Sequence, residues 1–160
     1  QYDTYTPMQL SQYINTIAND GVRVKPRVVV EATITNSNLT SYTNPVTVLS
    51  TLENVPAIQR VQDGFRLCVT DGYCSALNDL PVAVAAKTGT AEAFMNDEAG
   101  NYFDSPNSLL VSYAPFDEPE ISIACAIPHA WNDTSQTNAC LRISRDIYAY
   151  YFNEISSGEN

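Results

Sequence analysis

The feature that most constrains the fold is an unbroken apolar run, Leu80–Ala86, that ends abruptly in Lys87-Thr88-Gly89. A short apolar run containing β-branched and small residues is typical of a strand buried on both faces. Lys87 then stands at the end of that strand, where an ammonium costs free energy unless it is paired or hydrogen-bonded. The run therefore predicts a covered sheet with a charged group at one strand end.

The residues after the apolar run suit a ligand that approaches the backbone closely. Thr88 and Thr90 offer hydroxyls, and Gly89 has no side chain to keep a ligand away. An amide N–H on the open side of such a strand can stabilise an oxyanion. Lys87, Thr88, Gly89 and Thr90 are therefore the candidate site residues. A given tetrapeptide such as Lys-Thr-Gly-Thr also arises by chance, so its functional meaning depends on the rest of the chain.

The surrounding segments predict an α+β domain, an antiparallel sheet flanked by helices. Thr6-Pro7-Met8-Gln9 is a capping box with proline at the first helical position, which predicts a helix from Pro7 to Asp20. Leu109–Ala114 and Ile121–Ile127 are separated by a short connection and should pair as an antiparallel hairpin. The Lys87 strand, near 82–91, is expected in the same sheet.

The remaining elements follow from periodicity. Strands are expected at Arg27–Thr35 and Val46–Leu52 around a polar excursion at 36–44, and residues 96–106 are expected to form an exposed loop. Helices are expected at 54–72 and 136–154, the last one lying across the sheet. Their expected apolar stripes are Ile58, Val61, Phe65 and Cys68 in the first, and Cys140, Ile143, Ile147 and Tyr151 in the second.

The charge balance excludes some partners. The chain has 160 residues, with 8 lysines and arginines against 18 acidic residues and a net charge of -10. Nucleic acids and anionic membrane surfaces both bind basic patches, so neither is an expected partner. No apolar run approaches the ~20 residues of a membrane span, and there is no signal peptide. Any export signal or anchor is expected outside these residues.

Taken together, the motifs resemble the transpeptidase domain of class B penicillin-binding proteins. The matching features run in the family's order: Tyr5-Thr6-Pro7-Met8-Gln9-Leu10, Asn19-Asp20-Gly21, Lys87-Thr88-Gly89-Thr90-Ala91-Glu92, and the Ser112-Tyr113-Ala114-Pro115 turn. A terminal strand and helix follow. The resemblance covers nearly the whole chain, and the first and third motifs together are more specific than either alone.

Two family motifs are missing. The nucleophile of the family lies in a Ser-x-x-Lys motif, and neither lysine fits it because positions 22 and 84 are valines. The Ser-x-Asn motif should precede Lys87, whereas the one match, Ser105-Pro106-Asn107, follows it in a predicted loop and is interpreted as coincidence. Residues 1–160 are therefore expected to be the C-terminal part of one transpeptidase domain, without the upstream nucleophile-bearing part.

The resemblance implies a function for the complete protein. A serine attacks the D-alanyl-D-alanine end of a peptidoglycan stem peptide, and the acyl group passes to an amine of a neighbouring stem; β-lactam antibiotics trap the acyl-enzyme. Lys87 would supply positive potential and assist proton transfer, Thr88 and Thr90 would bind the terminal carboxylate, and the Thr90 N–H would be half of the oxyanion hole. No metal or cofactor is implied, and the location would be extracytoplasmic.

Alternation along the strand constrains how these residues meet one ligand. Lys87 should lie on one face, and Thr88 and Thr90 on the other. Both faces reach one ligand only if the strand borders the cleft, which predicts a locally open edge. Glu92 completes the family pattern but fits a solvated residue equally well. His129, the only histidine, is interpreted as a surface or capping residue.

The four cysteines allow three pairings. Cys125 and Cys140 fall on predicted apolar faces and are most simply interpreted as small buried hydrophobic residues. Cys68 and Cys74 lie six positions apart across a predicted helix end and could close a short loop. An extracytoplasmic location would permit such a disulfide.

Other functions remain open at this level. A β-lactam sensor would keep the cleft without turnover, and a serine β-lactamase or a D,D-carboxypeptidase also carries Lys-Thr-Gly. The Thr-Pro-Met-Gln-Leu helix start and the Ala-Glu after the motif favour the transpeptidase. A purely structural α+β module is the remaining alternative. A Ser-x-x-Lys motif upstream of Gln1 would distinguish most of these.

Overall fold

Three antiparallel strands form the central sheet, in the order β5–β8–β9. They are β5 (Ala85–Ala91), β8 (Asn107–Ala114) and β9 (Ile121–Ile127). This computed structural model describes residues 4–32, 42–130 and 139–155. The hairpin predicted between the last two strands is confirmed, with Ala114 opposite Ile121 and Ser108 opposite Ile127. The predicted antiparallel pairing of the Lys87 strand is also confirmed.

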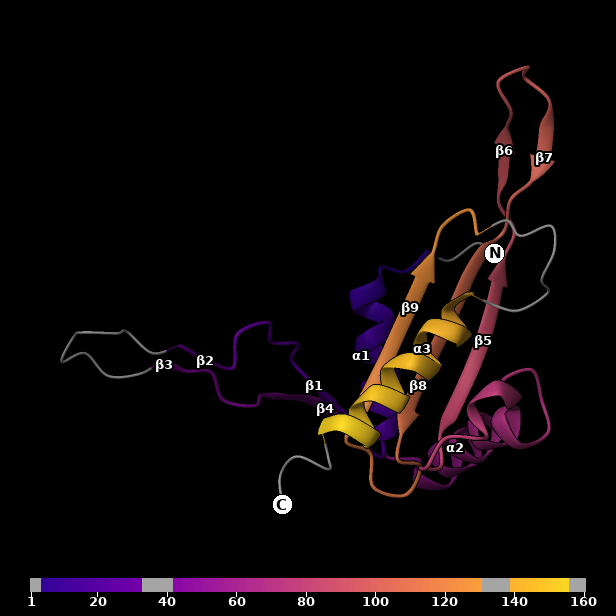
Figure 1. Cartoon of the computed structure of the whole chain (residues 1–160). Helices are drawn as coiled ribbons and strands as arrows, with labels where there is room; N and C mark the ends of the chain where they lie inside the picture. Colours follow the sequence, from indigo (N-terminus) through magenta and orange to yellow (C-terminus); the bar gives the residue numbers. More distant parts are fainter. Residues whose placement is uncertain (1–3, 33–41, 131–138, 156–160) are drawn as a thin grey trace.

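Helices cover both faces of this sheet (Figure 1). On one face, Ile14 and Ile17 of α1 (Pro7–Ala18) pack with Tyr113. On the other, α3 (Ala139–Tyr150) lies across the sheet, as predicted, and its Leu141 and Tyr148 join the larger core cluster around Leu110. The remaining long helix, α2 (Val55–Thr70), lies beside β5 and contributes to both clusters. The strand that carries Lys87, β5, is therefore held between two packed layers.

The first helix begins as its sequence predicts. The Gln9 N–H donates to Thr6 Oγ1 over 3.2 Å, and the Thr6 N–H donates to Gln9 Oε1 over 2.8 Å, which completes the capping box. The helix ends at Ala18, two residues before the predicted end. Asp20 and Gly21 have φ values of 50° and 87°, so the chain has already left the right-handed helical region there.

The predicted strand from Arg27 to Thr35 is wrong over most of its described length. A short strand, β1 (Val22–Val24), pairs instead with β4 (Val48–Thr51), which falls within the predicted strand 46–52. Farther out, β2 (Glu31–Ala32) pairs with β3 (Tyr42–Thr43), and residues 33–41 lie outside the described part of the chain. Val28, Val29 and Val30 are exposed, because this arm projects from the body and gives them no face to pack against (Figure 1).

The segment predicted as a loop at 96–106 contains part of a second hairpin, β6 (Phe94–Asn96) and β7 (Tyr102–Asp104). The Asp97 carboxylate accepts hydrogen bonds from the backbone N–H and the side-chain amide of Asn101, at 2.7 and 2.8 Å. These bonds close the turn and hold the pKa of Asp97 below its usual range. The polar residues that suggested a loop therefore build a hairpin turn.

The buried face of the last helix differs from the predicted stripe. Ile143 and Ile147 are 46% and 41% exposed. The buried residues are Cys140, Leu141, Ser144 and Tyr148. The Tyr148 hydroxyl lies 2.8 Å from Ser112 Oγ in the interior, so a polar contact fixes the rotation of the helix. The residues that follow, Tyr151–Ile155, form a π-helical turn, whereas 136–138 lie outside the described part of the chain.

The second helix also departs from its predicted stripe at one position. Ile58 and Phe65 are buried as expected, but Val61 is 38% exposed. Val69, which the prediction left out, is fully buried and belongs to the larger core cluster. Between this helix and β5, a single 3₁₀ turn, η1 (Ser75–Leu77), occupies the predicted loop.

The interpretation of Cys125 and Cys140 as unpaired residues is wrong. They form a disulfide with a Cα–Cα distance of 5.6 Å, which ties α3 to β9. Cys68 and Cys74, the pair that sequence spacing suggested, are free thiols. The bonded pair is 15 residues apart and comes together only because α3 folds back across the sheet.

Removing this disulfide is expected to destabilise the protein by about 3 kcal/mol, the loss of loop constraint for a 15-residue separation. The double variant Cys125→Ala/Cys140→Ala in the complete protein should unfold at lower denaturant than the parent. Reductant should destabilise the parent and leave the double variant unchanged. Equal sensitivity of the two proteins to reductant would contradict the assignment.

Candidate active site

The Lys-Thr-Gly-Thr segment lies inside β5, not after its end. The strand begins at Ala85 rather than in the preceding run, where Pro81 has no N–H to give to a ladder. The chain before it is held by other bonds: Arg66 Nη1 donates to the Val84 carbonyl over 2.9 Å, and the Phe116 N–H donates to the Ala83 carbonyl over 2.8 Å. These two hydrogen bonds hold the backbone just before the candidate residues.

The two faces of β5 separate the candidate side chains as predicted. Lys87 lies opposite Val111, and Thr88 lies opposite Leu110. Ala85, two residues before Lys87, packs in the α1 cluster, whereas Ala86 packs in the cluster on the α3 side. Strand alternation therefore places Lys87 on the α1 side, and Thr88 and Thr90 on the α3 side.

β5 is an edge strand among the described strands, because it pairs only with β8. Thr88 has its backbone groups on the unpaired side: its carbonyl accepts from Lys87 Nζ over 2.7 Å, and its N–H is near the Cys74 sulfur, whose pKa it lowers. In a strand, residues two apart direct their N–H groups to the same side. The Thr90 N–H therefore faces the same open edge.

Lys87 is exposed in this structure, so the expectation of a costly ammonium at a buried strand end is not met. Thr90 is also exposed, whereas Thr88 and Gly89 are half-buried. A Cβ added to Gly89 would lie 3.2 Å from the Leu109 Cβ, a tight contact with the neighbouring strand. Glycine at this position therefore lets β5 lie close to β8.

The other residues singled out from the sequence lie away from Lys87. Ser105 is buried, and Asn107 lies opposite Ala91, so the Ser-Pro-Asn match belongs to the start of β8. The Asn107 side-chain oxygen accepts the backbone N–H of His129 over 3.0 Å. His129 is exposed, in agreement with its surface interpretation, and Glu92 is exposed as well. Neither is brought to the open edge by a contact of the described residues.

Sequence reasoning missed Cys74 as a neighbour of the motif. It is fully buried, and its sulfur lies near the N–H of Thr88, the second motif residue. The 12 residues between Cys74 and Lys87 gave no periodic signal for this contact. It arises because η1 turns the chain back against the open side of β5.

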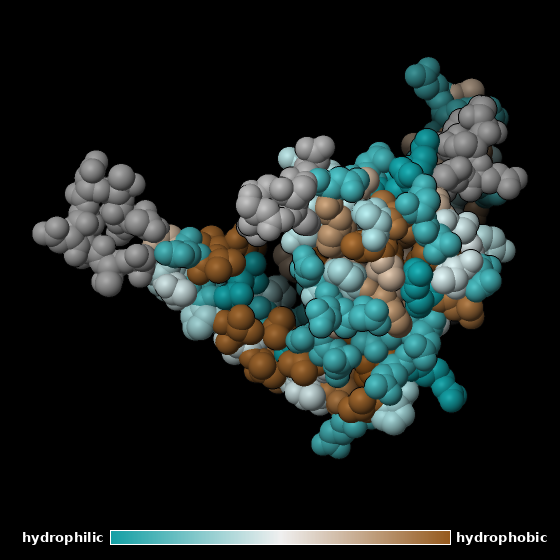
Figure 2. All heavy atoms as spheres, turned by 60° about the horizontal axis from the view of Figure 1, so that its bottom comes forward, coloured by the Kyte–Doolittle hydropathy of each residue, from teal (hydrophilic) through white to brown (hydrophobic). Residues whose placement is uncertain are grey.

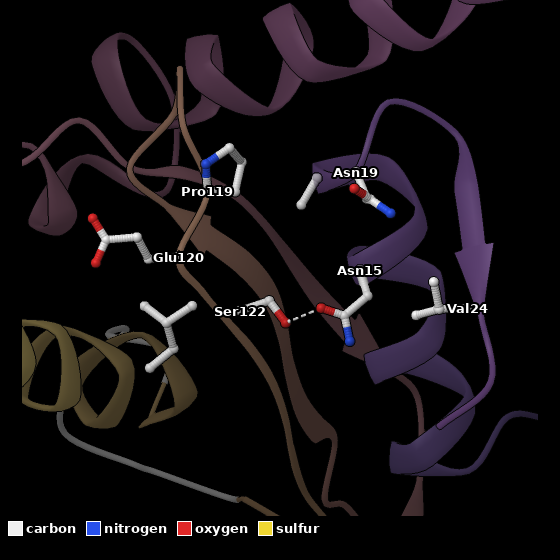
Figure 3. Close-up of a pocket in the computed structure, with 8 residues that line it drawn as sticks. Asn15, Asn19, Val24, Pro119, Glu120 and Ser122 are labelled. Carbon is white, nitrogen blue, oxygen red and sulfur yellow. Dashed lines mark hydrogen bonds between the residues drawn. The ribbon is translucent and has the colours of Figure 1, made fainter. Parts of the chain in front are cut away.

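Two pockets of the structure lie elsewhere. One, of about 280 Å³, lies between α1 and the start of β9, where Ser122 Oγ donates to Asn15 Oδ1 over 2.8 Å (Figure 3). The other, of about 310 Å³, includes Asp20, Asp63 and Asp117 in its lining. Neither is lined by a residue of the Lys87–Thr90 segment. We base the candidate site on the open edge of β5, because the chemistry-bearing groups gather there.

The described residues are 4–32, 42–130 and 139–155. Within these ranges, no group of histidine, cysteine, aspartate or glutamate side chains is arranged to hold a metal ion. In the same ranges, no helix combines the length and the apolar character needed to cross a membrane.

The fold, an antiparallel sheet covered by helices with Lys-Thr-Gly-Thr on an edge strand, can be compared with known protein families. The family model described as the penicillin binding protein transpeptidase domain matches residues 2–149. The chain therefore belongs to the penicillin-binding protein transpeptidase family, as the sequence motifs indicated.

Two curated relatives support this assignment. Penicillin-binding protein 2A of Bacillus subtilis is 37% identical over 161 residues, covering 95% of this chain and 22% of the relative. Penicillin-binding protein 2B of Streptococcus pneumoniae is 35% identical over 162 residues, covering 94% and 23%. The chain thus spans less than a quarter of the length of these relatives.

Solved structures show the same fold. Penicillin-binding protein 2B from Streptococcus pneumoniae strain R6 superposes with a TM-score of 0.77 at 32% identity, covering 96% of this chain and 26% of that one. An imipenem acyl-enzyme complex of penicillin-binding protein A from Mycobacterium tuberculosis gives 0.73 at 20% identity, covering 93% and 32%, a likeness of fold alone. The α+β class with an antiparallel sheet is therefore confirmed.

Proposed function

We propose that residues 1–160 are the C-terminal part of the transpeptidase domain of a serine-type peptidoglycan D,D-transpeptidase. One observation carries the proposal: in a member of this family, Lys87 to Thr90 line an open strand edge toward which the Thr88 and Thr90 amides are directed. The nucleophile and its Ser-x-x-Lys motif belong to polypeptide outside these residues. The chain supplies one wall of the cleft and is inactive by itself.

The geometry supports a division of labour along this edge. Lys87 carries the positive charge that attracts the substrate carboxylate and assists proton transfer to and from the attacking serine. The Thr88 and Thr90 hydroxyls bind the carboxylate of the D-alanyl-D-alanine end. The Thr90 N–H forms half of the oxyanion hole, which stabilises charge that develops on the carbonyl oxygen during attack. A β-lactam enters the same cleft as a substrate mimic and acylates the serine.

The N-terminal remainder of the same protein is the proposed partner of the exposed apolar surface. Hydrophobic side chains gather along the projecting arm, which runs from β1 through β2 and β3 to β4, and where this arm joins the body (Figure 2). Among the exposed ones are Val28, Val29, Val30, Val46, Val48, Leu49 and Leu52. Covering apolar surface is favourable by roughly 25 cal/mol per Å². The remainder also carries the membrane anchor and places the domain outside the cytoplasm.

Labelling with a fluorescent penicillin tests this proposal. The complete protein and the isolated 160-residue chain are each exposed to the reagent and separated on a denaturing gel. We expect a covalently labelled band for the complete protein and none for the isolated chain, since the chain lacks the nucleophile. A stable labelled band at the 17.6 kDa chain would show that the nucleophile lies within it.

Turnover with a donor stem peptide and an acceptor amine then separates the remaining functions. The transpeptidase forms the cross-linked product. A sensor takes the label without any turnover, a carboxypeptidase releases D-alanine without cross-linking, and a β-lactamase loses the label rapidly through hydrolysis. Any of these three results would replace the proposed activity.

A further inference from the structure

The two free cysteines meet at the end of α2. Cys68 lies in the last turns of the helix, and Cys74 precedes η1. The Cys74 N–H donates to the Cys68 carbonyl over 2.9 Å, and the two thiols are close enough for Cys68 to raise the pKa of Cys74. Burial, followed by the neighbouring Cys68 side chain, raises the pKa of the Cys74 thiol to about 12. Cys68 is half-buried, whereas Cys74 is fully buried.

A glycine brings this pair together. A Cβ on Gly72 would lie 2.9 Å from both the Cα and the carbonyl oxygen of Cys68, so only a residue without a side chain lets the chain fold back so tightly. The turn returns Cys74 to the side of the helix that carries Cys68. The two sulfurs are therefore brought together by backbone geometry.

The pair also touches the candidate active site. The Cys74 sulfur lies near the Thr88 N–H on the open side of β5, and this N–H and the Lys87 charge both lower the pKa of the thiol. Cys74 packs with Val84 and Ala86, the residues that lead into the motif. A change in the bonding of this sulfur should therefore alter the position of the β5 edge that carries Lys87 and Thr90.

We propose that Cys68 and Cys74 are a redox modification site that closes reversibly into a second disulfide beside the motif strand. The oxidant is an external disulfide. The half-buried Cys68 thiolate attacks one of its sulfurs and releases one thiolate; Cys74, after losing its proton, attacks the Cys68 sulfur and releases the second. Two cysteine thiols are oxidised, the external disulfide is reduced to two thiols, and a dithiol reductant reverses the reaction.

Closure changes the contact with Thr88. The Cys74 sulfur moves toward Cys68 and away from the Thr88 N–H that it lies near in the dithiol form. We expect the strand edge to shift and acylation of the complete protein to slow by about threefold to tenfold, the range expected for one hydrogen bond. This consequence rests on the proposed function, whereas bond formation does not.

Peptide mapping of the complete protein tests closure directly. Trypsin cleaves after Arg66 and Lys87, so residues 67–87 form one peptide that contains both cysteines. After incubation with oxidised glutathione, denaturation and alkylation, this peptide should have lost two hydrogens and taken up no alkyl group. After dithiothreitol it should take up two. A peptide that keeps two alkylated cysteines, or only glutathione adducts, overturns the proposal.

Two controls accompany the test. Cys125 and Cys140 share the separate tryptic peptide 88–142, which reports a disulfide already present before oxidation. A Cys68→Ser variant cannot close, so its acylation rate should not respond to oxidised glutathione, while that of the parent falls and recovers with dithiothreitol. Closure without any change in rate overturns the coupling to β5. If the protein is not acylated at all, the proposed function fails, and the peptide mass still decides closure.

Discussion

Replacing Lys87 by alanine in the complete protein is expected to slow acylation by penicillin by roughly 10²–10⁴-fold, the usual contribution of positioned proton transfer. The melting temperature should barely change. The side chain is exposed, and its ammonium donates a hydrogen bond to the Thr88 carbonyl next to it. Such an exposed contact adds little to stability, so the loss should appear in the reaction and not in the fold.

Thr90→Val is the matched comparison on the same strand. It removes the carboxylate-binding hydroxyl and keeps the backbone N–H at the open edge, so its acylation rate should fall less than that of Lys87→Ala. Second-order acylation rates and melting temperatures of the three proteins are measured together. If Lys87→Ala acylates within about threefold of the parent while its melting temperature collapses, the lysine is structural and the proposed role of this strand is wrong.

Much of the architecture could be predicted because its signals are local. The Thr6–Gln9 capping box marks the start of its helix within four residues. The connection after Ala114 is short, so the next strand pairs antiparallel with the one before it. The motif residues were likewise identified by their order in the chain. Their separation onto two faces followed from strand alternation alone, and the structure agrees.

The errors concern contacts that depend on distant parts of the chain. In the last helix, the isoleucines gave a more apolar stripe than Ser144 and Tyr148, yet the latter face the sheet. Tyr148 reaches Ser112, and Cys140 is bonded to Cys125; together these contacts fix the helix rotation. Neither partner is near in sequence, so composition along the helix could not reveal them.

The orientation of backbone groups at the open edge of β5 also could not be predicted from nearby sequence. The sequence required that the Lys87 strand border a cleft, but it could not say which backbone groups face outward. The structure answers this: the Thr88 carbonyl accepts from Lys87 Nζ, and the Cys74 sulfur lies near the Thr88 N–H on the side opposite β8. The contact depends on the fold-back at Gly72, a turn whose sequence gives no hint of what it will touch.

Leu110→Ala is expected to show the opposite effect to Lys87→Ala. Leu110 is 1% exposed and packs in the core cluster with Val84, Ala86 and Tyr148, opposite Thr88 on the α3 side. Truncating a buried leucine removes apolar burial and leaves a cavity, at a cost of about 2–5 kcal/mol. The complete protein should therefore unfold at clearly lower temperature and denaturant concentration.

Leu67→Ala is the control for this loss, because Leu67 is 59% exposed on α2 and alanine suits a helix. It should cost less than about 1 kcal/mol. Well below its melting temperature, Leu110→Ala should still acylate at nearly the parent rate, since the side chain lies on the covered face and not at the open edge. A rate loss as large as that of Lys87→Ala, with stability unchanged, would mean that the core and the edge have been assigned to the wrong sides of β5.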